Sequence, residues 1–178
     1  MKSMQHMYER FEYIADRWID NTDRYSEEQF LRKPDDLQWS VGQVYVHLIQ
    51  STNQFHLRQI HQCVSQQGIV MRGGKKLPGV IAFMMGMFPP VRIHVPPSPS
   101  YTPVQPINKH DVIRQLQELK KSVKAALPEV EKASPRCKTE HPALGYLNAR
   151  EWFQLIPMHF HHHRRQQSRL NTFLADIH

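Results

Sequence analysis

Apolar residues recur every three or four positions in four long segments, and this spacing limits the possible folds more than any other feature of the chain. Such spacing places the apolar side chains on one face of a helix. No alternation of apolar and polar residues is long enough to indicate a competing strand. Four amphipathic helices in 178 residues predict one all-α domain, residues 1–178, built as a four-helix bundle.

Capping residues mark where three of the four helices begin. Ser40 and Gln43 form an S-x-x-Q capping pattern at the start of the second helix. Asn148 and Glu151 form a reciprocal pair at the start of the fourth helix, which runs to the C-terminus, and the third helix opens near Asn108. The first helix is marked by its apolar face, which comprises Met4, Met7, Phe11, Ile14 and Trp18.

A connection rich in proline and glycine, roughly residues 68–106, separates the second and third helices. Proline lacks an amide donor and restricts φ, so this stretch cannot be helical throughout. Its apolar middle, Ile81 to Phe88, is suited to a short helix against the bundle. A turn around Pro34 joins the first two helices, and a shorter break from Pro128 to Leu147 joins the last two. One long crossover favours an up-down-down-up order of helices.

Charge, cysteine content and hydropathy argue against several classes of protein. A net charge of +7 can attract nucleic acid, but the basic residues are scattered along the chain. Cys63 and Cys137 match no redox or metal-binding spacing and are expected to be free thiols. The longest apolar run, Val80 to Phe88, is too short to cross a membrane. The first twenty residues do not resemble a signal peptide, so the expected location is cytoplasmic.

Histidine is the unusual residue of this sequence, with 12 in all and four between positions 159 and 163. His159 and His163 fall on the apolar seam of the fourth helix, where a buried polar side chain needs a partner. Spaced four residues apart, they point the same way and can bind one metal ion. The seam consists of Trp152, Ile156, His159, His163, Gln166, Leu170, Phe173 and Ile177.

His47 is the candidate third ligand, because it lies at the edge of the apolar face of the second helix. Gln43, Ser51 and Gln54 extend a polar strip on the same side of that helix. If the second and fourth helices are neighbours, His47 can complete a set of three histidines inside the bundle. Three histidines are a known ligand set for a divalent metal ion.

Other interpretations of the histidines stay open. A core histidine is more often a hydrogen-bonded structural residue than a metal ligand. The stretch containing His161, His162, Arg164 and Arg165 can be a solvated face or a basic patch for phosphates, and His162 can also support a ligand histidine. The remaining histidines are expected on the surface, in loops or away from the pocket: His6, His56, His61, His94, His110, His141 and His178.

A recognisable set of motifs runs through the chain. It reads H-P-x-x-G-x-L from His141 to Leu147, E-W at Glu151 and Trp152, and H-x-x-H-H-x-x-Q from His159 to Gln166. Two earlier segments accompany it, W-S-V-G-Q with H-L between positions 39 and 48, and Y-T-P at positions 101–103. With these motifs the chain resembles the DinB-like superfamily, which includes the YfiT-type metal-dependent hydrolases.

The resemblance implies an up-down-down-up four-helix bundle, often a homodimer, with a divalent metal ion bound by His47, His159 and His163. Zinc or nickel is the ion that the resemblance suggests. Characterised members include transferases and isomerases that use a low-molecular-weight thiol, whereas many others are described only as hydrolases. A shared fold with shared ligands does not determine the substrate.

Three histidine ligands leave at least one coordination position open, as in catalytic metal sites. That position can hold water for hydrolysis or a thiol for transfer to a small-molecule substrate. No glutamate accompanies the paired histidines as a general base, which favours thiol transfer. Gln43 and Gln166 are placed to contact a cofactor, a substrate or a ligand histidine. The hypotheses are a metal-dependent hydrolase or thiol transferase, a non-catalytic metal- or ligand-binding module, and a partner of nucleic acid.

Overall fold

The computed structural model describes residues 3–65, 73–89 and 102–176, and these residues are mostly helical, as predicted. The principal helices are α1 (Met4–Asn21), α3 (Val41–Gln50), α4 (Arg58–Val64), α6 (Lys109–Lys132) and α7 (Ala149–Ala175). A π-helical segment, η2 (Ser51–Leu57), joins α3 to α4, so that the three form one continuous helix. The shorter elements are η1 (Thr22–Arg24), α2 (Glu27–Leu31), α5 (Leu77–Met85) and the strands β1 (Lys138–His141) and β2 (Gly145–Asn148).

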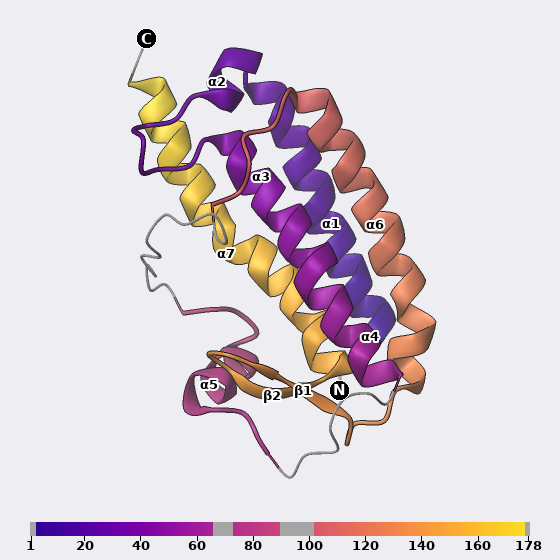
Figure 1. The fold of residues 1–178 in the computed structure, drawn as a ribbon. Helices are drawn as coiled ribbons and strands as arrows, with labels where there is room; N and C mark the ends of the chain where they lie inside the picture. The colour runs from indigo at the N-terminus through magenta and orange to yellow at the C-terminus, as the bar shows by residue number, and fades with distance from the viewer. Residues whose placement is uncertain (1–2, 66–72, 90–101, 177–178) are drawn as a thin grey trace.

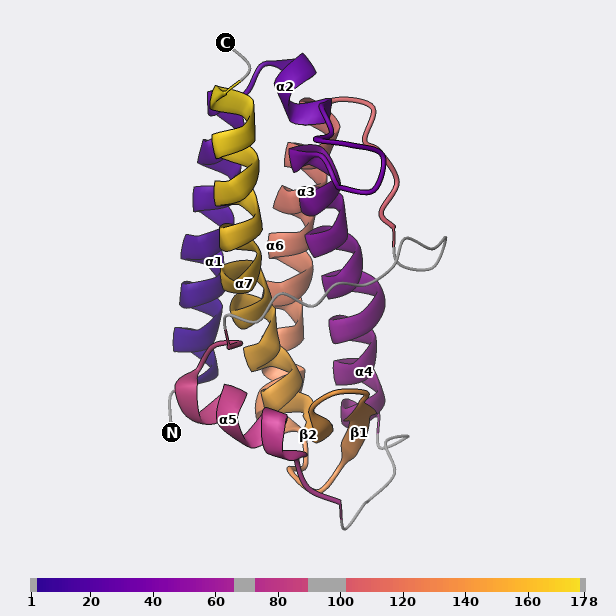
Figure 2. The same ribbon diagram turned by 90° about the vertical axis from the view of Figure 1, so that its left-hand side faces the viewer.

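The long helical segments lie alongside one another, as Figures 1 and 2 show: α1, the continuous helix from α3 to α4, α6 and α7. α1 and α3 each pack against both α6 and α7. α1 and α7 run toward the end of the molecule that carries α2, whereas α3 to α4 and α6 run the opposite way (Figure 1). Within the described ranges, every helix is too short or too polar to cross a bilayer.

The helices bury the apolar faces that the sequence predicts. Phe11 and Trp18 of α1 and Val112 of α6 are almost completely buried. The ring of Trp18 packs edge-on against Tyr45 of α3, with the ring centroids 4.8 Å apart. Buried apolar area provides most of the free energy that holds such helices together. The core therefore brings α3 and α7 against the same neighbours, and the histidines lie on these two helices.

The predicted helix starts are confirmed. Ser40 Oγ accepts a hydrogen bond from the amide of Gln43 at 3.0 Å, and Gln43 Oε1 accepts one from the amide of Ser40 at 3.0 Å. Asn148 and Glu151 form the same reciprocal pair at the start of α7, and Asn108 caps α6. Each cap satisfies amide groups that the first helical turn leaves without partners.

The break predicted between Pro128 and Leu147 is partly wrong. α6 continues through Pro128 to Lys132, and the burial of Leu127 and Val130 in the same turns offsets the hydrogen bond and the steric fit that the proline costs. The rest of the break contains an antiparallel hairpin of β1 and β2, in which Thr139 pairs with Leu147. An all-α prediction misses this hairpin because its strands have four residues each, too few for an alternating pattern to stand out.

The described part of the long connection contains the expected short helix, at different bounds. α5 begins at Leu77 instead of Ile81 and ends at Met85. The next residue, Gly86, has φ 65° and so adopts the left-handed conformation that closes many helices. Gly79 of α5 approaches the hairpin so closely that an added Cβ would lie 2.3 Å from the carbonyl oxygen of Leu144. Residues 66–72 and 90–101, including Tyr101 of the Y-T-P motif, and Ile177 of the seam lie outside the described residues.

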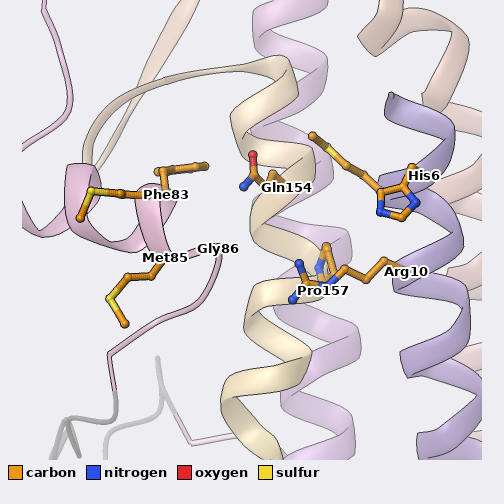
Figure 3. A pocket seen from close by; sticks show the side chains of 9 residues that line it. His6, Arg10, Phe83, Met85, Gly86, Gln154 and Pro157 are labelled. Carbon is orange, nitrogen blue, oxygen red and sulfur yellow. The ribbon is translucent and has the colours of Figure 1, made fainter. Parts of the chain in front are cut away.

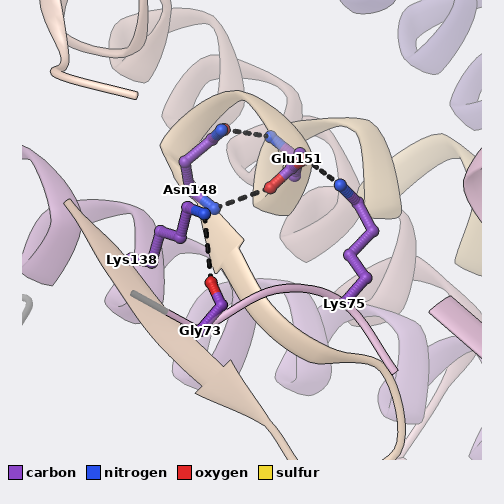
Figure 4. Close-up of polar contacts among 5 residues, drawn as sticks. All are labelled: Gly73, Lys75, Lys138, Asn148 and Glu151. Atoms are coloured by element: carbon purple, nitrogen blue, oxygen red, sulfur yellow. Dashed lines mark hydrogen bonds and ion pairs between the residues drawn. The ribbon is translucent and has the colours of Figure 1, made fainter. Parts of the chain in front are cut away.

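The start of α7 is tied to the chain that precedes α5, as Figure 4 shows. Glu151 forms an ion pair with Lys75 while its other carboxylate oxygen accepts from the amide of Asn148 at 2.9 Å. Lys138 of β1 donates to the carbonyl oxygen of Gly73 at 3.1 Å. These bonds hold the N-terminal end of α7 in place, and the histidine pair follows two to three turns later.

Candidate metal centre

Side-chain nitrogens of three histidines from two helices lie close together, and the space between them is called here the meeting point. His47 lies on α3, and His159 and His163 lie one turn apart on α7. His159 Nε2 is 3.2 Å from His47 Nε2 and 3.0 Å from His163 Nε2. The ligand nitrogens of the three residues all lie within 4.8 Å of one another. The structure therefore brings together the three histidines that the sequence singles out.

The protons of two of these rings are held on the side away from the meeting point. His163 Nδ1 lies 2.9 Å from Gln166 Oε1, an oxygen that can only accept, so Nδ1 carries the proton. Ser51 Oγ gives its one hydrogen to the carbonyl oxygen of Leu48 and thus accepts from His159 Nδ1 at 3.3 Å. In the neutral rings, the Nε2 atoms of His159 and His163 are left with bare lone pairs.

A metal ion fits this donor set. Two lone pairs 3.0 Å apart repel each other, because no proton lies between them to form a hydrogen bond. Imidazole nitrogens bound to a tetrahedral zinc ion at about 2.0–2.1 Å lie about 3.3 Å apart, close to the separations found here. A cation at the meeting point would use both lone pairs and that of His47. Gln166 and Ser51 are outer partners of the kind that orient metal-binding histidines.

Burial keeps the three rings in the neutral form that binds metal. It is the main cause that lowers the pKa of His47 to about 4 and that of His163 to about 3. The pKa of His159 is lowered well below its usual value, first by burial and then by the charge of His163. Near neutral pH the centre therefore consists of uncharged imidazoles.

His56 lies against the centre, contrary to the sequence prediction. Its ring packs edge-on against that of His159, with centroids 5.4 Å apart, and it is only 5% exposed. In a regular helix the nine residues from His47 to His56 make about 2.5 turns, which would place the two on opposite sides. The wider turns of η2 reduce this rotation and bring His56 toward α7.

The two predicted glutamines have different surroundings. Gln166 contacts a ligand histidine, as its position on the seam suggests. Gln43 uses its side-chain oxygen to cap α3 and its nitrogen to donate to the carbonyl oxygen of Pro103 at 2.7 Å. It thus anchors the end of the long connection, and its predicted contact with a cofactor or substrate stays a prediction. The buried glutamine of α7 is Gln167, which donates to the hydroxyl of Tyr45 at 3.2 Å.

Aromatic rings surround the centre. The ring of Trp39 lies 5.0 Å from that of His47, and His162 packs edge-on against His163 with centroids 5.3 Å apart. His141, expected on the surface, is half-buried, with its ring 5.4 Å from that of Trp152. Burial lowers the pKa of His141 to about 4. A chain of histidine and aromatic rings therefore extends from the centre toward the hairpin.

A separate cavity of about 240 Å³ lies between α1, α5 and α7, and Figure 3 shows its lining. Phe83 and Met85 of α5 face Pro157 of α7, with Arg10 of α1 at one side. None of the three ligand histidines lines this cavity. It is therefore distinct from the candidate metal centre.

Comparison with known families settles the relationship that the motifs suggest. A sequence profile of the DinB superfamily matches residues 8–167, a range that includes all three histidines. The chain belongs to the DinB superfamily. A comparison with curated proteins gave no match.

The motifs of this DinB-superfamily protein divide between the fold and the metal centre. His141 Nδ1 accepts hydrogen bonds from the amides of Ala143 and Leu144, at 3.1 and 3.2 Å, and so closes the hairpin turn. Gly145 takes φ 84° at the end of this turn, and Glu151 caps α7. The H-P-x-x-G-x-L and E-W motifs therefore build the start of α7, and H-x-x-H-H-x-x-Q supplies Gln166 and two of the three histidines that could hold a metal ion.

Proposed function

We propose that this protein is a metal-dependent enzyme that acts on a small molecule as a thiol (S-)transferase or a hydrolase. His47, His159 and His163 would hold one divalent ion, with zinc or nickel expected, and would leave a coordination position open for a reactant. The observation that carries the proposal is the convergence of three neutral imidazoles, two of which, His159 and His163, direct free Nε2 lone pairs at one another.

A divalent ion in such a site lowers the pKa of a water molecule or thiol that reaches it and thereby supplies a nucleophile at neutral pH. The residues of the chain would orient the ligands and exclude water around them. Gln166 and Ser51 hold the Nδ1 protons of His163 and His159, and the rings of Trp39 and His56 pack against the ligand rings. Pre-set ligands of this kind favour binding and reduce reorganisation during the reaction.

The absence of a nearby carboxylate favours thiol transfer over hydrolysis. Among the described residues, the group of mutually close ligand atoms at the centre consists of His47, His159 and His163 and includes no Asp or Glu. None of the 16 acidic residues lies in the ranges left undescribed, so those ranges cannot supply one. A metal-bound thiol needs no base for its attack, whereas hydrolysis commonly uses one. The same observation supports a second candidate, a metal- or ligand-binding module without catalysis.

The metal content of untagged, as-purified protein tests the proposal. Plasma mass spectrometry is expected to find near-stoichiometric zinc or nickel in the wild type and little in His159→Ala. His161→Ala removes a histidine from the same helix outside the ligand set and should retain the metal. A wild-type protein that stays metal-free even after incubation with divalent ions would exclude the proposed site.

Activity then separates the enzyme from the binding module. Screens for thiol transfer and for ester or amide hydrolysis should give a reaction that requires the metal and is lost in His159→Ala. Tight metal binding with no reaction in either screen would support the module. Full activity in a verified metal-free sample would rule out the metal-dependent enzyme.

The resemblance to DinB-like proteins also leads us to propose a homodimer of single-domain chains, each an up-down-down-up bundle, located in the cytoplasm. The helix directions in Figure 1 support the bundle order. Light scattering coupled to gel filtration should give twice the mass of 21.0 kDa. A monomeric mass across a range of protein concentrations would contradict the dimer.

A further inference from the structure

Two arginines on α7 follow the histidines of the candidate metal centre within two turns of helix and are exposed to solvent. They are Arg165 and Arg169, called here the α7 arginine pair. Counted along the helix, they follow His162 by three and seven residues, so all three side chains lie along one side of α7. That side adjoins the face that carries His159, His163 and Gln166.

The α7 arginine pair has no carboxylate partner among the described residues. The ion pairs there involve other basic side chains, such as Lys75 with Glu151 and Lys120 with Asp16. All 16 acidic side chains of the chain fall in the described ranges, so the undescribed ranges contain no Asp or Glu that could pair with the arginines. Two guanidinium groups are thus left free to bind an anion from outside the chain.

The helix geometry places Arg169 nearer the side of α7 that carries the three clustered residues His159, His163 and Gln166, whereas Arg165 lies two residues from His163 and faces away from that ring. Side chains of a helix lean toward its N-terminus, so Arg169 covers the turn around Gln166, and Arg165 covers the turn around His162. Arg169 starts six residues beyond His163, about 9 Å along the axis, and its long side chain shortens that gap.

Gln166 provides a further donor between the arginines and the ligands. Its oxygen accepts from His163 Nδ1, so its NH₂ group points elsewhere and has no acceptor among the described residues. Gln166 lies three residues from both His163 and Arg169 and so lies between them on α7. A guanidinium and an amide NH₂ side by side form a donor set for the oxygens of a carboxylate or phosphate.

We propose that the substrate of the metal centre carries an oxyanion group, a carboxylate or a phosphate, that the α7 arginine pair binds with the NH₂ group of Gln166. The substrate would lie along α7, with its reacting group at the three histidines and its anionic group one to two turns nearer the C-terminus. This inference rests on the proposed function, because it names the class of substrate for the same site. The positive charge of the pair would also draw anionic substrates toward the centre.

Anion binding to the full-length, as-purified protein tests the inference. Inorganic phosphate and succinate are titrated separately, and binding is followed through the arginine side-chain Nε–Hε signals in NMR spectra. Arg165→Gln and Arg169→Gln should each weaken binding of the better anion by about tenfold, as expected for loss of one charge-assisted contact. Arg164→Gln is the matched control, because it removes the same charge from the neighbouring position of the same helix and should change affinity less than about twofold.

The outcomes separate the inference from its alternatives. Preference for phosphate or succinate identifies the oxyanion, and an equal effect of Arg164→Gln would overturn the inference by showing a general field effect. Absence of binding by both anions would also overturn it. So would binding of a DNA duplex to which all three arginines contribute equally, with a steep salt dependence. In His159→Ala the anion should still bind, so loss of the metal centre and loss of the arginine site give different results.

Discussion

The position of one proton on His163 depends on Gln166. The amide oxygen accepts from Nδ1 at 2.9 Å and so leaves the Nε2 lone pair directed at the other two histidines. Gln166→Leu removes this acceptor and allows the proton to move to Nε2. We expect the affinity for zinc to fall by roughly 10- to 100-fold, the usual cost of losing such an outer partner. Competition with a chromophoric chelator measures this change.

A second substitution at the same position serves as the control. Gln166→Glu keeps an acceptor for His163 Nδ1 and adds a negative charge, which makes the ring a better ligand. Zinc affinity at least equal to that of the wild type is expected. If Leu and Glu variants bind zinc equally, the hydrogen bond has no part in the site.

His56 makes a further prediction possible, because its buried Nδ1 has no hydrogen-bond partner among the described residues. Burial lowers its pKa to about 3, whereas in the unfolded chain the value is about 6.5. Between these values the unfolded state binds more protons, so His56 makes the folded protein less stable as pH falls. In metal-free protein, His56→Phe should increase the free energy of unfolding by about 1 kcal/mol at pH 7.5 and by more at pH 5.

Urea denaturation of metal-free wild type and His56→Phe at the two pH values tests this expectation. His61→Phe, which replaces an exposed histidine two residues before Cys63 on α4, is the matched control. A His56→Phe variant that is less stable at both pH values would mean that the Nδ1 atom has a partner in solution.

Among the elements, η2 explains why the centre has more histidine neighbours than the sequence predicts. A π-helical segment interrupts the regular spacing between α3 and α4 and changes which residues face α7. Ser51 accepts from His159 at the first residue of this segment, and His56 packs against the same ring near its end. One irregular segment therefore provides both contacts with His159.

The hairpin positions the start of α7 through a conformation that favours glycine. Gly145 has φ 84°, and an added Cβ would lie 2.5 Å from the amide nitrogen of Lys76. Gly145→Ala should lower the free energy of unfolding by about 1–3 kcal/mol, because both the backbone and the contact become strained. Gly74→Ala is the control, since an added Cβ there has nothing within 4 Å. Equal stability of the two variants in urea would contradict this account.

At the scale of the whole molecule, the candidate metal centre brings together two distant parts of the chain. His47 and His159 are 112 positions apart and belong to helices that the core packs together. An ion that binds only this folded arrangement stabilises it, by about 2.7 kcal/mol at 100 times its dissociation constant. Thermal unfolding should therefore shift to higher temperature with added zinc. The shift should vanish in His159→Ala, and an equal shift in that variant would indicate zinc binding elsewhere.

Local features of the sequence determined the buried helix faces, the helix starts and the shared direction of two of the histidines. Apolar spacing marks the buried faces of α1 and α6, and capping pairs mark the starts of α3 and α7. The spacing of four residues between His159 and His163 places both on one side of α7, because helical geometry repeats over one turn. These properties depend on neighbours in the sequence, so they can be read without knowing the packing.

Only the tertiary structure decided which side chains complete the centre. His47 reaches the pair because the core packs α3 against α7, and His56 reaches it because η2 changes the helical rotation. The protons of His159 and His163 are placed by Ser51 and Gln166, and the first of these comes from another helix. The physical reason is that helical periodicity specifies a direction within one helix, whereas distances between helices and irregular turns depend on how the whole core packs.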